Sequence, residues 1–141
     1  MPPACSALIS LLDRGARRQR HWWLAAEGEP GRIAALLAAP LRGSDAPPRR
    51  FEEILRVFAP LPPLPPAAAG PAGQRAGYRY LIQLRRSGAC VSCWRRHGGG
   101  IGWQRRCGPM GLGPFLRHFR ATPGGAGGRW SAPADTPGAT V

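Results

Sequence analysis

Four residue types dominate this chain of 141 residues: alanine (22), glycine (20), arginine (20) and proline (17) together make up more than half of it. Glycine and proline reach the level that is typical of disordered or low-complexity sequences, and the formal net charge is +13. This composition excludes a large hydrophobic core. We expect at most about 40–60 ordered residues, and domains of that size are marginal without a metal, a disulfide or a partner.

The charge is distributed unevenly along the chain. Residues 1–53 hold 8 arginines and 6 acidic residues, whereas residues 54–134 hold 12 arginines and no acidic residue. A segment without internal counter-charge repels itself and attracts polyanions. GC-rich codons alone would also produce a high arginine content, so the charge indicates polyanion binding without establishing its purpose.

Residues 6–24 fit a basic amphipathic helix. At 100° per residue its apolar side chains fall on one side, and its basic side chains fall on the other. The apolar set is Leu8, Leu11, Leu12, Trp22 and Trp23, and the basic set is Arg14, Arg17 and His21. Three interpretations stay open: a core helix with a solvated basic face, a helix on a membrane surface, and a targeting presequence.

Two shorter helices follow. The first is predicted from Pro30 until Pro40 stops it, and the second begins at Phe51 and ends before Pro60. In the second, the apolar residues repeat at helical spacing. Together with residues 6–24 these helices define a short-helix region over residues 1–59.

A proline-rich segment marks the clearest boundary in the chain. Residues 60–66 read as a polyproline II helix, and the alanines and glycines up to residue 77 predict a flexible linker. The PxxP spacing resembles an SH3 ligand, but the basic anchor that such a ligand carries at a fixed offset is missing. We therefore interpret residues 60–77 as a spacer.

The segment 78–120 is rich in arginine and cysteine and is β-prone. Apolar and polar residues alternate from Tyr78 to Arg85, Ser87-Gly88 can form a turn, and residues 89–94 and 101–107 can pair as further strands. A small hairpin or meander in residues 78–107 is the prediction. Residues 115–120 fit one or two helical turns, and residues 121–141 are expected to be a disordered tail.

The fold class predicted from these elements is a mostly irregular, disordered, low-complexity chain. Short helices occupy its N-terminal half, and a small β-structure lies in residues 78–107. No apolar run reaches the roughly 18 residues that a transmembrane helix needs, so no spanning segment is expected.

Four residues form a candidate zinc site: Cys90, Cys93, His97 and Cys107. Three thiolates and an imidazole suit tetrahedral zinc, but the spacing matches no zinc module that we can name. Buried thiols without a metal are the alternative. The Cys90–Cys93 pair is a weaker candidate for redox chemistry, because the βαβ context of thioredoxin-like proteins is absent. Apart from zinc, no cofactor is expected.

Arginines alternate with aromatic residues in the same segment, and guanidinium groups pair with phosphates while rings stack on unpaired bases. The candidate nucleic-acid-binding residues are Arg79, Arg85, Arg86, Trp94, Arg95, Arg96, Trp103, Arg105 and Arg106. A solvated arginine face beside buried aromatics is the alternative. Any such binding would be independent of sequence and would weaken steeply with salt.

No catalytic residue is predicted. His97 and the three glycines after it resemble an oxyanion loop, but no serine lies in a Gly-x-Ser-x-Gly turn, and residues 54–134 lack carboxylates for acid–base catalysis. The protein is not expected to be an enzyme.

Two functional interpretations remain. The first is a basic chain without an assignable activity, translated from a GC-rich reading frame that was never selected to fold. The second is an accessory protein that binds RNA or another single-stranded nucleic acid through segment 78–120. An intracellular location is expected, nuclear or, if residues 1–25 are a presequence, mitochondrial; the few cysteines agree with a reducing compartment.

Overall fold

The computed structural model describes residues 5–38, 48–86, 88–96 and 102–120. Their strands form a six-stranded sheet in the order β3-β2-β1-β4-β5-β6. The bounds of the strands are β1 Ala7–Asp13, β2 Arg18–Leu24, β3 Pro63–Leu64, β4 Tyr78–Arg85, β5 Gly88–Arg96 and β6 Trp103–Gly111. The helices are α1 Pro30–Ala38, α2 Phe51–Phe58, α3 Pro66–Arg75 and α4 Leu112–Arg120.

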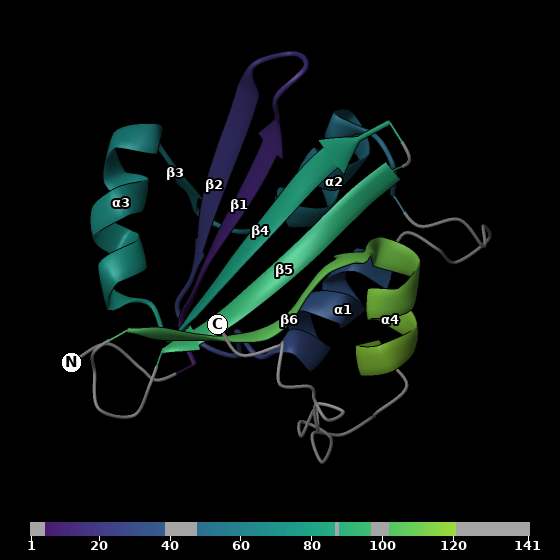
Figure 1. Ribbon diagram of the computed structural model, residues 1–141. Helices are drawn as coiled ribbons and strands as arrows, with labels where there is room; N and C mark the ends of the chain where they lie inside the picture. Colours follow the sequence, from purple (N-terminus) through teal and green to yellow (C-terminus); the bar gives the residue numbers. More distant parts are fainter. Residues whose placement is uncertain (1–4, 39–47, 87, 97–101, 121–141) are drawn as a thin grey trace.

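The sheet joins the two halves of the chain. β1 pairs with β2 in an antiparallel hairpin on one side and with β4 in parallel on the other, while β4, β5 and β6 form an antiparallel meander. The connection from β2 to β4 carries α1, α2, β3 and α3. Figure 1 shows the strands fanning out from one end of the sheet.

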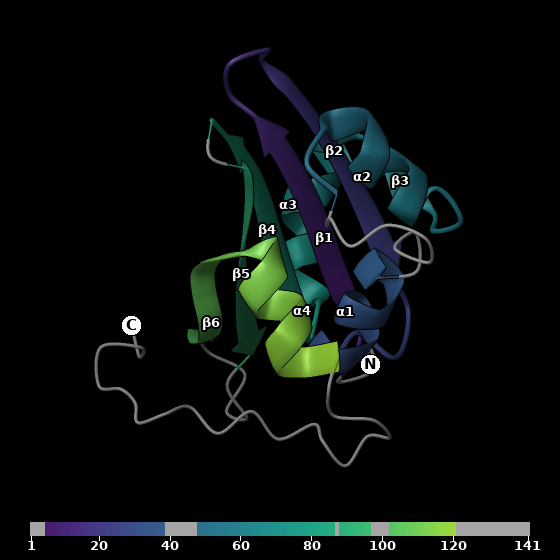
Figure 2. The same ribbon diagram turned by 90° about the vertical axis from the view of Figure 1, so that its right-hand side faces the viewer.

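Helices cover the two faces of the sheet unequally. α1, α2 and α4 lie on one face, and α3 lies alone on the other, as Figure 2 shows. The first face contains the main core, a cluster of 22 buried residues that draws side chains from β1, β4 and β5 and from all three of its helices. The second face has a cluster of only three buried residues, Leu8, Ala69 and Ala76.

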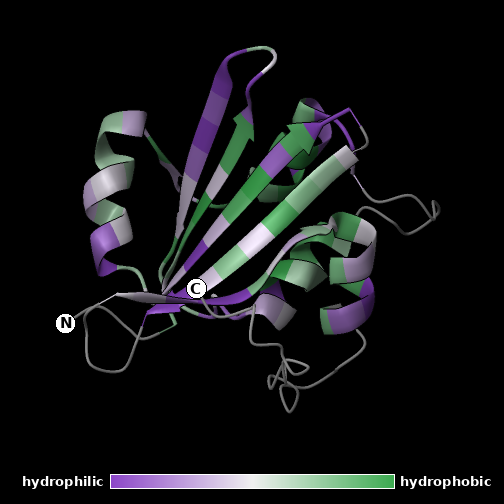
Figure 3. Ribbon diagram, in the orientation of Figure 1, coloured by the Kyte–Doolittle hydropathy of each residue, from purple (hydrophilic) through white to green (hydrophobic). Residues whose placement is uncertain are grey.

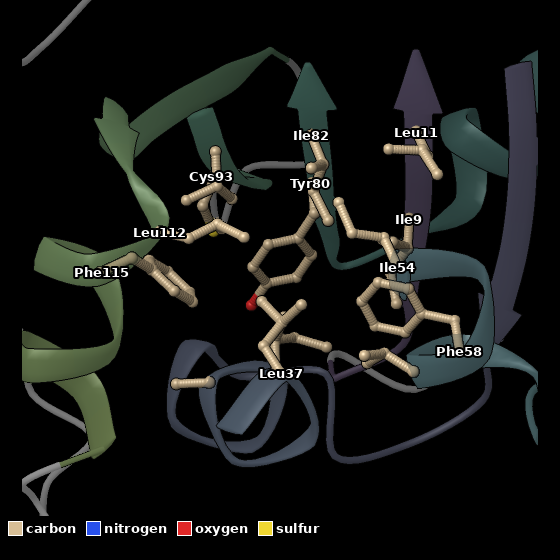
Figure 4. Close-up of a cluster of buried hydrophobic side chains, with 14 of the residues drawn as sticks. Ile9, Leu11, Leu37, Ile54, Phe58, Tyr80, Ile82, Cys93, Leu112 and Phe115 are labelled. Carbon is tan, nitrogen blue, oxygen red and sulfur yellow. The ribbon is translucent and has the colours of Figure 1, made fainter. Parts of the chain in front are cut away.

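Tyr80 lies at the centre of the main core. Its ring points from β4 into the space between Leu37 of α1 and Phe115 of α4 (Figure 4), and its side chain is almost completely buried. Ile9 and Ile82 project from the sheet into the same core. These residues are spread widely along the sequence, but the strand and helix periods bring them to one layer.

The predicted fold class is wrong, and so are the descriptions of the chain as disordered and low in complexity. The six-stranded sheet and four helices form an ordered domain rather than a mostly irregular chain. The bulky apolar residues looked too few and too scattered to form a core. The strands β1, β4 and β5 nevertheless place alternate residues in the main core, so a modest number of apolar residues is enough to fill it.

The helix predicted for residues 6–24 is also wrong, because these residues form the β1–β2 hairpin. In β1 the apolar residues Ala7, Ile9 and Leu11 face the main core, and Leu8 packs on the other side beneath α3. An apolar run that is buried on both faces hides the two-residue period of a strand. The membrane-surface and presequence interpretations had rested on this helix.

The linker predicted for residues 60–77 instead contains β3 and α3. α3 is a helix of low intrinsic stability: Gly70 and Gly73 each cost about 1 kcal/mol relative to alanine, and Pro71, inside the helix, costs about 3 kcal/mol. Its packing against β1, β2 and β3 is therefore what holds it in place.

Other predicted elements are present. The helices expected from Pro30 and from Phe51 are α1 and α2. α2 begins where the Glu53 carboxylate accepts hydrogen bonds from the backbone N–H groups of Arg49 (2.8 Å) and Arg50 (3.0 Å). The predicted meander is β4–β6, and the predicted helical turns near residue 115 are α4. The predicted tail, residues 121–141, lies outside the described residues.

Candidate nucleic-acid interface

Five residues from five neighbouring strands are paired in one line across the sheet. Trp23 of β2 pairs with Leu8 of β1, Leu8 with Arg79 of β4, Arg79 with Trp94 of β5, and Trp94 with Arg105 of β6. Directly paired residues project from the same face of a sheet. We call this line the cross-strand row. With strands about 4.8 Å apart, it extends over roughly 19 Å.

The cross-strand row lies on the face opposite the main core. Leu8 belongs to the small cluster under α3, whereas the residues beside Leu8, Arg79 and Trp94 in their strands are main-core residues such as Ile9, Tyr80 and Cys93. Figure 3 shows both hydrophilic and hydrophobic residues along β4, as expected for a strand with one face in the core and one face outside it. Arg79 is exposed, and Trp94 and Arg105 are half-buried.

α3 divides this face into two parts. It packs on β1, β2 and β3 and so covers the row at Leu8 and Trp23. Over β4, β5 and β6 no helix in the described part of the chain covers the row at Arg79, Trp94 and Arg105. We call this second part the open face.

Arg96 and Trp103 connect the open face to α3. They are paired in register on the same side of the sheet as the cross-strand row, and the guanidinium carbon of Arg96 lies 4.6 Å from the centroid of the Trp103 ring. Arg79 approaches the same ring at 5.4 Å. Such distances allow cation–π attraction.

The guanidinium of Arg96 also binds the C-terminal end of α3. It donates hydrogen bonds to the carbonyl oxygens of Ala76 (3.0 Å) and Gly73 (3.3 Å) and to that of Gln74. These carbonyls carry the partial negative charge of a helix C-terminus. In this arrangement Arg96 holds the end of α3 against the sheet, and its N–H donors are occupied by backbone carbonyl oxygens.

The remaining predicted arginines are dispersed. Arg85 is exposed at the end of β4, on the same face as Gln83, to which it donates a 3.3 Å hydrogen bond, and Arg86 is exposed in the turn that follows. Arg95 points to the other side of β5, with its guanidinium 5.6 Å from the ring of Tyr78. Arg106 falls at the irregularity in the β5–β6 pairing.

Carboxylates are absent from the open face within the described residues, and those that exist have partners elsewhere. Asp13 and Glu52 pair with Arg18 at 3.3 and 2.9 Å, and Glu27 pairs with Arg32 at 3.9 Å. The positive charge of the open face is therefore not neutralised locally. In addition, the buried Nε of Arg105 has no hydrogen-bond partner among the described residues.

A polar chain lies farther along the same face, between β1 and β2. The Oγ of Ser10 lies 2.7 Å from Nδ1 of His21, and Nε2 of His21 lies 2.7 Å from the amide oxygen of Gln19. The amide oxygen can only accept, so Nε2 carries the proton and Ser10 donates to Nδ1. Burial lowers the pKa of His21, which keeps the ring neutral at pH 7. Both ring nitrogens are thus occupied, and the ring is held in place.

The candidate zinc ligands are only partly brought together. Cys93 and Cys107 are paired in register and buried in the main core, whereas Cys90 pairs with Gln83 and Gly111 on the opposite face of β5. His97 lies outside the described residues. Within those residues, no group of three or more histidine, cysteine or acidic side chains could hold a metal ion.

The chemistry of Cys93 follows from its surroundings. Burial, and then the adjacent Cys107 thiol, raise the pKa of Cys93 well above its ordinary value, so the thiol stays protonated near neutral pH. The thiolate needed for metal binding or disulfide exchange is disfavoured. Cys90 and Cys93, the candidate redox pair, project from opposite faces of β5 and do not approach each other there.

Sequence reasoning missed two residues of the cross-strand row, Leu8 and Trp23. It assigned both to the apolar side of a helix. No local signal was available for Trp23, because β2 consists of four consecutive polar residues, Arg18 to His21, followed by three consecutive apolar ones, Trp22 to Leu24. The two-residue period that would favour a strand over a helix is therefore not visible in β2.

No protein family matches this sequence, and no curated protein or solved structure matches it either. None of the helices in the described ranges is both long and apolar enough to cross a bilayer. The residues of the sheet are therefore the basis for a functional conclusion.

Proposed function

We propose that the protein binds single-stranded nucleic acid on the open face, through Arg79, Trp94 and Arg105. One observation carries the proposal: these residues are directly paired across three strands, so a tryptophan is flanked on both sides by an arginine. The arrangement lies in a region of the sequence that contains no acidic residue.

Each side chain has a specific role. The guanidinium groups of Arg79 and Arg105 pair with phosphate oxygens, for which their fork of N–H donors is well matched. The ring of Trp94 stacks on a base, and stacking contributes about 1–3 kcal/mol per base. Because every base has a flat face, this contact does not read sequence.

The geometry favours single strands over duplexes. Stacking on Trp94 requires a base that is not already stacked between its neighbours. A half-buried ring in the middle of a sheet does not project far enough to enter a groove of duplex DNA, which is read by helices, arms or ribbons. We therefore expect duplexes to bind more weakly than single strands at the same salt concentration.

A titration of a fluorescein-labelled oligouridylate of about 12 nucleotides, followed by anisotropy, tests the proposal. Trp94→Ala should weaken binding by roughly 5–150-fold, which corresponds to the loss of one stacked base. Arg105→Ala should weaken binding and reduce the slope of log K against log salt concentration by about 1. The oligodeoxyuridylate and a duplex of the same length distinguish RNA, single-stranded DNA and duplex binding.

Arg95→Ala is the matched control. It removes the same charge from the residue next to Trp94, but from the opposite side of β5. A much smaller loss for Arg95→Ala than for Arg105→Ala supports binding on the open face. Equal losses, with no effect of Trp94→Ala, would show that the chain attracts polyanions only through its net charge, and would overturn the proposal.

A further inference from the structure

The aromatic residues of this face continue beneath α3. Trp23 and Trp103 are half-buried and pack against the small cluster of Leu8, Ala69 and Ala76 under that helix. Trp23 is the end of the cross-strand row that carries Trp94, so the covered and open parts are one continuous surface. Together they present three tryptophan rings, of which α3 covers two.

The contacts that hold α3 over this surface are few. Two of the three residues in the buried cluster are alanines, and the helix itself contains Gly70, Pro71 and Gly73. Helices with such residues depend on packing for their stability, and the residues that α3 buries are all small: Ala69, Ala72 and Gly73. The main core, by contrast, does not involve α3 at all.

The polar contacts of α3 use a group that would itself bind phosphate. Arg96 donates to the carbonyls of Gly73, Gln74 and Ala76 while it lies against Trp103. A phosphate is a stronger acceptor for a guanidinium than neutral carbonyl oxygens are. A nucleic-acid strand that reaches Arg96 therefore competes with α3 for the same donors.

We infer that α3 is a displaceable cover, and that a single-stranded nucleic acid bound on the open face extends beneath it to Trp103, Arg96 and Trp23. This inference rests on the proposed function. The bound strand replaces the α3 carbonyls at Arg96 with phosphate oxygens and replaces the alanines over the two rings with stacked bases. Affinity then depends on the equilibrium between the covered and uncovered states.

Two glycines of α3 allow this equilibrium to be shifted in opposite directions. Gly73 faces the sheet, where a Cβ would lie 3.2 Å from Cδ2 of Leu8 and 3.6 Å from Nε of Arg79, so Gly73→Leu should prevent α3 from docking. Crowding of Arg79 alone would weaken binding, so tighter binding by this variant reports the loss of the cover. Gly70 faces solvent, with nothing within 4 Å of a Cβ at that position, so Gly70→Ala should stabilise α3 without a new contact. Gly70→Leu is the matched control for Gly73→Leu.

The experiment measures the affinity of the labelled oligouridylate and the sites of ultraviolet cross-linking to an oligonucleotide that contains 5-bromouridine. Gly73→Leu should bind the oligonucleotide about tenfold more tightly, because the covered state is lost. Gly70→Ala should bind about fourfold more weakly, because the difference in helix propensity between alanine and glycine stabilises the covered state and lowers the uncovered population by about that factor. Cross-links to the peptides of Trp23 and Trp103 should be present in the native chain and increase in Gly73→Leu. Gly70→Leu should not increase them.

The outcomes separate this inference from the proposed function. One outcome would overturn the inference that α3 is a displaceable cover and leave the open-face site intact. In that outcome binding depends on Trp94, cross-links are confined to Trp94, and neither glycine variant changes the affinity. Absence of any Trp94-dependent binding would overturn both. If Gly73→Leu fails to fold, the predicted loss of affinity and of Trp23 cross-linking in Gly70→Ala still decides the question.

Discussion

The hydroxyl of Tyr80, on the central strand β4, donates a 2.5 Å hydrogen bond to the carbonyl oxygen of Gly28, which lies just before α1. Both partners are buried, so water does not compete for the carbonyl. Burial raises the pKa of Tyr80 well above its ordinary value, so the hydroxyl stays protonated and can donate near neutral pH. One bond thus joins the sheet to the helical layer.

Removal of this hydroxyl should destabilise the domain. Tyr80→Phe leaves the Gly28 carbonyl buried without its donor, and an unsatisfied group of that kind costs about 1–3 kcal/mol. Urea unfolding followed by circular dichroism measures the change. Tyr78→Phe is the control, since no hydrogen bond of its hydroxyl is found within the described residues; an equal loss in both variants would show that the Tyr80–Gly28 bond has no special importance.

Gly28 is also a point of close approach between backbone segments. A Cβ at this position would lie 2.6 Å from the Cβ of Ala7 and from the carbonyl oxygen of Cys5. Gly28→Ala should therefore destabilise the protein by about 1–3 kcal/mol, as overpacked core substitutions do. Gly15→Ala, whose nearest neighbour would be an Asp13 carboxylate oxygen at 3.6 Å, should change the free energy of unfolding by less than about 0.5 kcal/mol.

His21 should make the stability depend on pH. Its pKa is lowered by burial in the folded protein and is about 6.5 in the unfolded chain, so between these two values the unfolded chain binds more protons. Stability is therefore fully present above about pH 6.5 and falls as the pH decreases towards the folded pKa. Urea midpoints at a series of pH values should show this decline.

The variant His21→Gln isolates the contribution of His21. It should flatten part of the pH dependence, whereas His118→Gln removes the separate contribution of a histidine whose pKa burial also lowers. An unchanged slope in His21→Gln would contradict the neutral, hydrogen-bonded ring between Ser10 and Gln19.

The four cysteines should differ in reactivity. Cys5 and Cys90 are half-buried, whereas Cys93 and Cys107 are buried in the main core, and burial raises the pKa of Cys93. In the native protein, Cys93 and Cys107 should react with a disulfide reagent only after the sheet opens. Mass spectrometry of partially labelled protein measures the order, and labelling of Cys93 as fast as Cys90 would contradict the described burial.

The sequence predicted the local structure of some segments because each carried an unambiguous pattern. In α2 the apolar residues Phe51, Ile54 and Phe58 repeat at helical spacing, and in β4 the residues Tyr78, Tyr80 and Ile82 occupy every second position. Neither pattern has a competing interpretation.

Other segments were misinterpreted because their structure depends on contacts that are distant in the sequence. Leu8 looks like a helix residue until α3, about 60 residues later, is seen to cover it. α3 itself has the composition of a linker and is ordered through its packing.

The candidate site was predictable only in part, for the same reason. Arg79, Trp94 and Arg105 were selected by residue type, but their alignment depends on the register between strands. That register includes an irregularity between Cys93 and Trp94 that no local pattern indicates, and Arg95 and Arg105 fall on different faces because of it. The pairing of β1 with β4 likewise follows from no local signal.

Because one sheet and one core contain residues from both halves of the chain, we expect the two halves to unfold together. Ile54 of α2 and Ile82 of β4 belong to segments that the sequence assigned to separate regions, yet both are fully buried in the main core. Ile54→Val and Ile82→Val should each destabilise a single transition by about 0.5–1.5 kcal/mol. Urea unfolding of the metal-free chain, followed by both circular dichroism and tryptophan fluorescence, should give coincident curves. If the chain had never been selected to fold, the signal would instead change gradually without a midpoint, and if the regions were independent, each variant would shift only one of two transitions.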